Sequence, residues 1–268
     1  MKVEVRKLAE TTSTNTVVAE EARRGAEEGL VVVADYQTAG RGRFDRRWEA
    51  PPGASLLFSV LLKPGPPESA SAANRLHLAV AAVSLAVAEA AEVVAGVRLS
   101  LKWPNDLLGP DGRKVAGVLA EVVAGAPRTP SAGDTSALVV GVGLNVSWAP
   151  EEATSLEALA SRALDRDDLL ASALQALERL WGNWEGVGRL YRERLATLGQ
   201  QVVVRLAGGR GGDVALRGTA IGVGEDGRLL LKTHEGLVEV AAGDVEHAAL
   251  EPTRGPRATG PGGETSSP

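Results

Sequence analysis

The chain has 268 residues, of which 44% are hydrophobic and 24% are charged, and its formal net charge is −5. This composition is typical of a soluble globular protein of one or two domains and excludes a largely disordered chain. The absence of cysteine excludes disulfides, thiolate metal sites and a cysteine nucleophile, and the negative charge argues against a broadly basic nucleic-acid-binding surface.

The first half of the chain predicts strands and helices joined by polar or glycine-rich turns. We expect helices over residues 17–24, with Ser13 or Thr14 as the N-cap, and over residues 68–94. Segments rich in glycine and proline predict loops over residues 37–54 and 124–136. The predicted strands cover residues 3–8, 30–36, 55–62, 97–103, 106–108 and 114–123.

The second half changes character after Gly199. Before it, we expect a strand over residues 138–146 and helices over residues 155–163 and 167–198. After it, tight glycine turns join short strands, which indicates a separate small β-barrel. These strands cover residues 201–206, 215–223, 229–233 and 237–241. The final segment, residues 251–268, is rich in glycine, proline, serine and threonine and is expected to be disordered.

Targeting and metal-binding patterns are absent from the sequence. His77, His234 and His247 are too scattered for metal-ligand spacing. The longest apolar stretch, residues 78–88, falls short of the ~20 residues that span a bilayer, and the N-terminal segment alternates like a strand. We therefore expect a cytoplasmic protein that does not bind membranes.

An arginine-rich segment follows the strand predicted over residues 30–36. Four arginines lie within residues 41–47, and Gly40 and Gly42 allow the backbone to approach a bound group closely. Arginine forks match phosphate or carboxylate oxygens, and Trp48 can cover an aromatic ligand. The segment predicts an anion-binding loop, and the alternative is a basic loop exposed to solvent.

Two of the six lysines lie at the predicted hairpin over residues 106–123. Lys102 precedes the hairpin in a Lys-Trp-Pro-Asn-Asp run, and Lys114 begins its second strand. A lysine ammonium suits the stabilisation of an oxyanion or a polyphosphate. Asp106 can position Mg²⁺ or accept a proton, and both roles stay open. The alternative is an ordinary strand that ends in a Pro-Asn-Asp turn.

Two further groups of residues point to a small polar ligand. Gly141 and Gly143 interrupt an apolar strand, which indicates close approach of a ligand or another backbone, or plain strand packing. Residues 13–15 and Gln37 offer neutral donors and acceptors that suit a urea, an amide or a sugar, or that serve only as a helix cap. All four groups together favour recognition of a polyanion joined to a small polar ligand.

These motifs, taken together, resemble the biotin protein ligases. They follow one another in that family's order as Ser13–Asn15, Gln37–Arg43, Lys102–Asp106, Lys114–Glu121 and Gly141–Val146. The resemblance implies an α+β fold with a catalytic domain over residues 1–198, built on a central mixed β-sheet flanked by helices. It implies that a small SH3-like β-barrel follows over residues 199–250.

The resemblance also implies a two-step reaction. Biotin is activated with ATP as biotinyl-5′-AMP, with release of pyrophosphate, and a lysine of a biotin carboxyl carrier protein then takes the biotinyl group. ATP, biotin and Mg²⁺ are therefore the expected ligands, and the carrier domain of a biotin-dependent carboxylase is the expected partner. Family members often dimerise through their central sheets, so a homodimer is compatible with the resemblance.

Roles for single residues follow from the same resemblance. The expected catalytic residues are Lys114, Arg43 and Asp106, with Lys114 foremost. The expected biotin-binding residues are Ser13, Thr14, Asn15, Gln37, Gly40, Arg41, Arg43, Lys114 and Gly117. The expected ATP-binding residues are Arg43, Arg46, Trp48, Lys102, Asn105, Lys114 and Asn145.

Two features depart from the family pattern. Asp45 stands where the family loop usually carries glycine. Only twelve residues precede Ser13, which leaves no room in this sequence for the N-terminal DNA-binding domain of some members, so we expect a ligase that does not bind DNA. The alternatives are a lipoate or octanoate protein ligase, and a non-catalytic module that senses biotin or a nucleotide.

Overall fold

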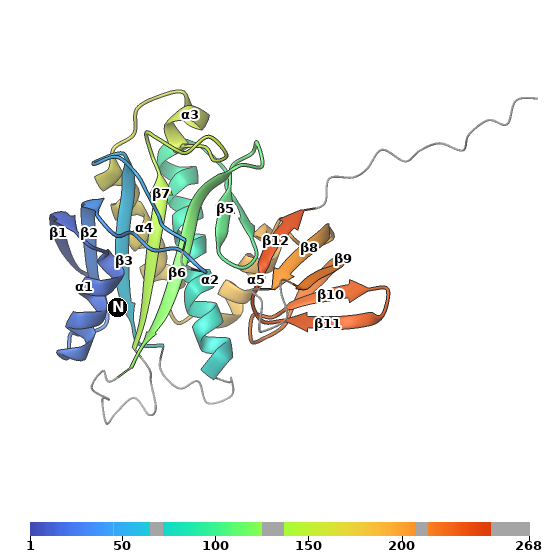
Figure 1. Ribbon diagram of the computed structural model, residues 1–268. Coiled ribbons are helices and arrows are strands. Elements are labelled where there is room, and N and C mark those ends of the chain that lie inside the picture. Colours follow the sequence, from blue (N-terminus) through green and yellow to red (C-terminus); the bar gives the residue numbers. More distant parts are fainter. Residues whose placement is uncertain (45, 65–71, 125–136, 207–213, 248–268) are drawn as a thin grey trace, which may run out of the picture.

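The computed structural model of the chain describes residues 1–44, 46–64, 72–124, 137–206 and 214–247 (Figure 1). The strands of its larger sheet are β1 (Glu4–Thr11), β2 (Leu30–Gln37), β3 (Ser55–Leu62), β4 (Ser100–Lys102), β5 (Asp106–Leu108), β6 (Lys114–Val123) and β7 (Ala137–Asn145). The smaller sheet consists of β8 (Gln201–Leu206), β9 (Val214–Val223), β10 (Leu229–Thr233), β11 (Gly236–Val240) and β12 (Asp244–His247).

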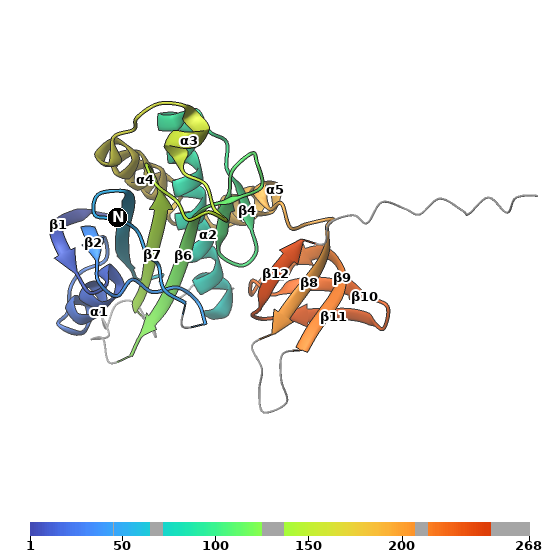
Figure 2. The same cartoon turned by 45° about the horizontal axis from the view of Figure 1, so that its top comes forward.

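The two sheets define two parts of the molecule. The larger sheet has the order β1-β2-β3-β7-β6-β5-β4, in which β1 and β2 are parallel and the other neighbours are antiparallel. The smaller sheet, β11-β10-β9-β8-β12, is antiparallel and forms a C-terminal domain beside the first (Figure 2). The predicted α+β class, with a mixed sheet and a small C-terminal β domain, is therefore confirmed.

Helices cover both faces of the larger sheet at its centre, where the apolar strands β2, β3 and β7 are buried along most or all of their length. Leu30 and Val32 of β2 pack with Val18 of α1 (Thr14–Arg23), whereas Val31 and Val33 face the opposite layer. That layer contains α2 (Ala72–Ala90) and α4 (Arg166–Leu180). Successive side chains of a strand point to opposite faces, so a continuous apolar run is what a sheet covered on both sides requires.

The helix α2 is the central helix of the core. It continues into a π-helix, η1 (Ala91–Ala95), and ends at Gly96, which has a left-handed φ of 70°. The span Asn74–Ala95 is long and apolar enough to cross a membrane, but 67% of its 18-residue apolar stretch is buried inside the protein. Such burial is typical of a core helix, and an apolar surface on all sides is what a fully packed helix needs.

The structure differs from the sequence-based expectations at several elements. The single helix predicted over residues 167–198 is wrong: the chain forms α4 and then α5 (Trp184–Arg194), because Gly182 adopts a φ of 87° and the Asn183 side chain accepts a hydrogen bond from the Gly186 amide. The strand β12 was not predicted, because it is short and charged, and only Val245 is buried.

Smaller differences concern boundaries. The helix α1 begins three residues before the predicted start, and β4 covers only part of the strand predicted over residues 97–103. A short helix, α3 (Leu156–Ala160), occupies the middle of the helix predicted over residues 155–163. The predicted disordered tail, and all but the first residue of the loop predicted over residues 124–136, lie outside the described residues.

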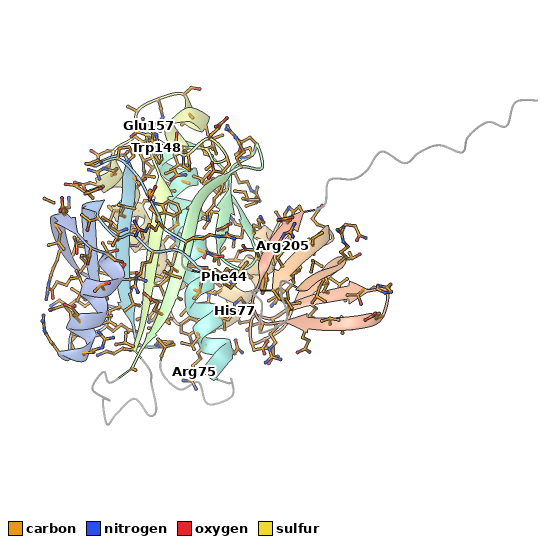
Figure 3. All side chains as sticks on the ribbon, viewed as in Figure 1. Phe44, Arg75, His77, Trp148, Glu157 and Arg205 are labelled. Carbon is orange, nitrogen blue, oxygen red and sulfur yellow. The ribbon has the colours of Figure 1, made fainter. Side chains whose placement is uncertain are left out.

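Contacts of α2 and of Trp103, which follows β4, hold the C-terminal domain against the larger sheet. The Trp103 indole Nε1 donates to the Gly227 carbonyl at 2.9 Å. Gly227 has a φ of 85°, and a Cβ there would lie 2.6 Å from the His77 ring, which itself packs edge-on against Tyr191 with ring centroids 5.0 Å apart (Figure 3). Burial lowers the pKa of His77 to about 4, and the nearby Arg192 lowers it further, whereas Asp226 opposes the shift.

This burial predicts an acid-sensitive stability. An unfolded His77 binds a proton near its ordinary pKa of 6.5, whereas the folded one does so only near 4, so the free energy of unfolding falls as the pH falls between these values. We expect the melting temperature of His77→Gln to lose part of this dependence between pH 6.5 and pH 4.5. The exposed His234 provides the control His234→Gln, and parallel curves for wild type and His77→Gln would contradict the assignment.

Candidate active site

A cavity of about 360 Å³ lies on the larger sheet, within the range of small-molecule sites. Its wall comes from the start of α1, the end of β2, the segment 41–49, the strands β5–β7 and the start of β12. Thirteen of the predicted site residues meet there: Ser13, Thr14, Asn15, Gln37, Arg41, Arg43, Arg46, Trp48, Asn105, Asp106, Lys114, Gly117 and Asn145.

Neutral polar side chains occupy one end of the cavity. The Gln37 Oε1 accepts the Thr14 amide at 2.7 Å and also lies 3.0 Å from the Thr14 hydroxyl. Ser13 occupies the N-cap position of α1 in an extended conformation, but its side chain makes no capping hydrogen bond. Gln37 thus satisfies a backbone donor at the start of α1, a role usually played by an N-cap side chain.

Glycines in β6 and β7 form the floor of the cavity. Gly117 and Gly143 are directly opposite each other in the sheet, and the Trp48 ring lies on both: a Cβ at Gly143 would be 2.4 Å from the ring. A Cβ at Gly141 would be 2.0 Å from the Asn15 Oδ1. The predicted close approach at Gly141 and Gly143 is therefore present, and side chains rather than another backbone fill the space.

The arginine-rich segment forms a hairpin, here called the cationic hairpin (residues 40–48). The Gly42 amide donates to the Arg46 carbonyl at 2.7 Å, and the Trp48 amide donates to the Gly40 carbonyl at 3.1 Å. Near the tip, Phe44 has a φ of 55° and lies on the side of the larger sheet that faces the C-terminal domain (Figure 3). Asp45, the departure from the family pattern, lies outside the described residues.

Charged groups gather at the other end of the cavity. The Lys114 Nζ lies 2.6 Å from the Asp106 carboxylate and 5.7 Å from the centre of the Trp48 ring. The Arg43 guanidinium donates to the Asn105 Oδ1 and to the Gly243 carbonyl, each at 3.2 Å. Burial lowers the pKa of Arg43, and the charges of Asp244 and Asp106 oppose this shift. A guanidinium stays charged at any physiological pH, so the site holds at least two cations.

A loop before α3 closes the cavity beside Lys114. The Thr154 amide donates to the Lys114 carbonyl at 2.9 Å, and the buried Asn145 donates from Nδ2 to the Thr154 carbonyl at 3.1 Å. These bonds fix the positions of Pro150 and Glu152 in the cavity wall. Asn145 therefore lines the cavity and also anchors its wall.

Two predicted site residues do not line the cavity. Gly40 lies at the base of the hairpin, where a Cβ would be 2.3 Å from the Trp48 carbonyl oxygen, so a glycine is needed there for the two strands to pair. Lys102 is opposite Asp106 in the β4–β5 pair, which places both side chains on the same face of the sheet. A hydrogen bond from Arg205 lowers the pKa of Glu246 on β12, and the charge of Lys102 lowers it further, so Lys102 lies beside the C-terminal domain.

Sequence reasoning missed residues that complete the site from distant segments. Ser59 on β3 links Thr14 to Asn15 by hydrogen bonds of 2.7 and 2.6 Å. Asp244, at the start of β12, forms an ion pair with Arg46 and lines the cavity. The sequence contained a signal for Ser59, because a serine in a fully buried apolar strand needs a polar partner. Nothing in the sequence indicated that Asp244 belongs to the site.

The arrangement suits one class of ligand. A neutral polar end, a smooth floor of glycine and indole, and a cationic end follow one another in a single cavity. An elongated acid with an amide-like head would place its carboxylate beside Lys114 and Arg43, where a phosphate would also be stabilised. The fold and the site thus define a protein that can join a small carboxylic acid to a phosphate group.

Comparisons with known proteins agree with this class. Residues 8–145 match the biotin/lipoate A/B protein ligase family, and residues 197–248 match the biotin protein ligase C-terminal domain. The chain therefore belongs to the biotin/lipoate protein ligase family and carries the C-terminal domain of biotin protein ligases.

Relatives with known names cover most of the chain. A biotin–[acetyl-CoA-carboxylase] ligase of Mycobacterium tuberculosis is 37% identical over 90% of this chain and 87% of its own length. A bifunctional ligase/repressor of Bacillus subtilis is 32% identical over 87% of this chain and 71% of its own length. The biotin protein ligase of Aquifex aeolicus, solved in complex with biotin and ATP, is 28% identical, has a TM-score of 0.73, and covers 91% of this chain and 99% of its own.

The tight packing at Gly141 predicts a large cost for a single methyl group. Gly141→Ala would place a Cβ 2.0 Å from the Asn15 Oδ1, and we expect the free energy of unfolding in urea to fall by about 1–3 kcal/mol. The matched control is Gly188→Ala in α5, where a Cβ would lie 3.5 Å from its neighbours; helix propensity there favours alanine by up to about 1 kcal/mol. Equal stability of the two variants would refute the packing argument.

Proposed function

We propose that this chain is an ATP-dependent biotin protein ligase. In the first step a biotin carboxylate oxygen attacks the α-phosphorus of ATP, forming biotinyl-5′-AMP while the bond to pyrophosphate breaks. In the second step the ε-amine of a carrier lysine attacks the acyl carbon, forming an amide while AMP leaves and the amine proton is lost. The observation that carries the proposal is one cavity with a neutral polar end and a cationic end, in a chain similar to named biotin ligases.

Biotin would lie along the glycine floor. Its ureido ring carries both donors and acceptors, which match the hydroxyls and amides of Ser13, Thr14, Asn15 and Gln37 and the backbone at Arg41. The valeryl chain would pass beside Gly117, where the absence of a side chain lets Trp48 and Lys114 line its path. Biotin's carboxylate would then reach the end of the cavity where Lys114 and Arg43 lie.

Lys114 and Arg43 would stabilise the charge that develops in adenylation. Negative charge grows on the α-phosphate as the carboxylate attacks, and preorganised cations lower the barrier most when water is largely excluded. Asp106 holds the Lys114 ammonium at 2.6 Å, so it would orient that charge in the first step. Its two other expected roles, positioning Mg²⁺ and accepting the proton of the acceptor lysine, remain part of the proposal.

The nucleotide would lie between the cationic hairpin and the C-terminal domain. Arg46, Asn105 and Asn145 would bind it, Trp48 would offer an aromatic face, and Lys102 would act from the edge of the site. The donor set fits Mg²⁺ that enters with ATP, because Asp106 and Asp244 both line the cavity and Mg²⁺ usually takes one or two carboxylates with the substrate phosphates. Bound there, Mg²⁺ would neutralise phosphate charge. Among the described residues no three His, Asp or Glu side chains form a metal cluster.

The acceptor is proposed to be the biotin carrier domain of a carboxylase, since named relatives are biotin–[acetyl-CoA-carboxylase] ligases. The cytoplasm is the proposed compartment, because the reaction consumes ATP. A homodimer is compatible with the resemblance to the family.

The direct test is biotin-dependent exchange of labelled pyrophosphate into ATP. Exchange requires reversible formation of the acyl-adenylate, so we expect it with biotin and not with lipoate or octanoate. Exchange with lipoate or octanoate instead of biotin would show that the chain is a lipoate or octanoate protein ligase. Biotin binding without any exchange would instead indicate a sensing module.

Lys114→Ala should lower the exchange rate by about 10²–10³, the scale of losing one preorganised oxyanion donor. Lys232→Ala, at an exposed position of β10, is the control that removes a lysine far from the cavity. A loss below fivefold in Lys114→Ala would remove this residue from the chemical step.

Arg43→Gly should shorten retention of biotinyl-5′-AMP. Arg43 links the cationic hairpin to Asn105 and to the C-terminal domain at Gly243, so its loss opens the phosphate end of the site. In a single-turnover assay we expect faster release of the adenylate and biotinylation of lysines on bystander proteins. An unchanged lifetime of the bound adenylate would contradict the role of Arg43.

A further inference from the structure

Glu121 lies on the cavity face of β6 but outside the cavity wall. Side chains two residues apart on a strand share a face, and Gly117 and Leu119 both line the cavity. Glu121 is the next residue on that face, beyond the neutral polar end. It therefore does not touch a ligand in the cavity directly.

One carboxylate oxygen of Glu121 joins two parts of the site. Its Oε2 accepts a hydrogen bond from the Asn15 Nδ2 at 2.7 Å and forms an ion pair with the Arg41 Nη2, also at 2.7 Å. Asn15 belongs to the first turn of α1, and Arg41 belongs to the cationic hairpin. The carboxylate is the described link between these side chains.

Asn15 is held on its other sides as well. Its Nδ2 also lies 3.3 Å from the Leu119 carbonyl, and its Oδ1 accepts the Ser59 hydroxyl at 2.6 Å in the space left by Gly141. Asn15 is only 3% exposed, so the Glu121 oxygen that accepts its amide cannot easily be replaced by water.

The contacts continue to the proposed ureido end. Because Ser59 donates its one hydroxyl proton to the Asn15 Oδ1, the Thr14 hydroxyl donates to Ser59, while the Gln37 Oε1 accepts the Thr14 amide. A continuous chain of hydrogen bonds thus runs from Gln37 through Thr14 and Asn15 to Glu121. The ion pair to Arg41 extends this chain to the hairpin.

We propose that Glu121 is a positioning residue that couples the position of the cationic hairpin to recognition of biotin's ureido ring. The inference rests on the proposed function. The two bonds of Glu121 differ in how much they stabilise the site. The ion pair with Arg41 joins side chains that are 44% and 33% exposed, so it contributes little by itself. The hydrogen bond to Asn15 is charge-assisted, and its Asn15 partner is buried, so it contributes more. Loss of the charge should therefore loosen the hairpin, and loss of the whole side chain should also misplace Asn15.

Two variants separate these effects. Glu121→Gln keeps an oxygen for Asn15 but removes the charge that pairs with Arg41. We expect its biotin Kd, measured by calorimetry without ATP, to stay within about twofold, and its adenylate release to accelerate about threefold. Glu121→Ala removes both bonds, and we expect its biotin Kd to rise about tenfold or more.

The control is Glu89→Gln, which neutralises a carboxylate in an ion pair between α2 and α4, with Arg179, far from the cavity. It should change neither quantity. A double-mutant cycle with Arg41→Ala adds a readout that general destabilisation would not give: the effects of Glu121→Gln and Arg41→Ala on adenylate release should not add.

The outcomes separate the two proposals. If wild type binds biotin and exchanges pyrophosphate but both Glu121 variants match it, the positioning role is wrong and the proposed function stands. If wild type binds no biotin, both proposals are wrong. If Glu121→Ala does not fold, the near-isosteric Glu121→Gln decides, because additive effects with Arg41→Ala would refute the coupling.

Discussion

A side chain at Gly141 or Gly143 would occupy the space that Asn15 and Trp48 fill, and the site depends on this close approach. Both glycines lie in β7, a strand buried along its whole length, where a larger residue would ordinarily add apolar packing. At these two positions the centre of the sheet therefore lacks apolar side-chain packing. Because these side chains are absent, Asn15 from α1 and the Trp48 indole from the cationic hairpin pack directly on the β7 backbone. This packing brings the neutral end and the cationic end into one continuous cavity.

Three cations of the site are paired with carboxylates before any ligand binds. Arg41 pairs with Glu121, Arg46 with Asp244 and Lys114 with Asp106. All three pairs are partly exposed, so each contributes little to folding. At the cationic end, a phosphate oxygen can take the place of the carboxylate beside Arg46 or Lys114 at small cost. The paired carboxylates thus hold the cations in position for a polyanion. Arg43 differs, because its hydrogen bonds go to neutral oxygens and burial has already stripped part of its hydration.

The sequence-based predictions succeeded where the signal was local. Continuous apolar runs predicted β2 and β3 almost to the residue, and turn residues predicted the hairpin of β5 and β6. They failed at two places where the local signal was overridden or weak. The helical pattern continues through Gly182 and Asn183, so the end of α4 there was not predicted. The charged strand β12 has little apolar pattern, so it was not predicted either. Register, and with it which side chains lie opposite each other, depends on pairing between strands that no single segment encodes.

The sequence by itself determined the α+β class, the family and most of the residues that line the cavity, because motifs with rare combinations of glycine, arginine and lysine remain legible without a structure. Only the tertiary structure decided how these motifs meet. It placed Lys102 at the edge of the site, made Gly40 a requirement of the hairpin, and added Ser59, Glu121 and Asp244. These residues are far apart along the chain, and hydrogen bonds and ion pairs between them form only after the sheet and the C-terminal domain have brought them together.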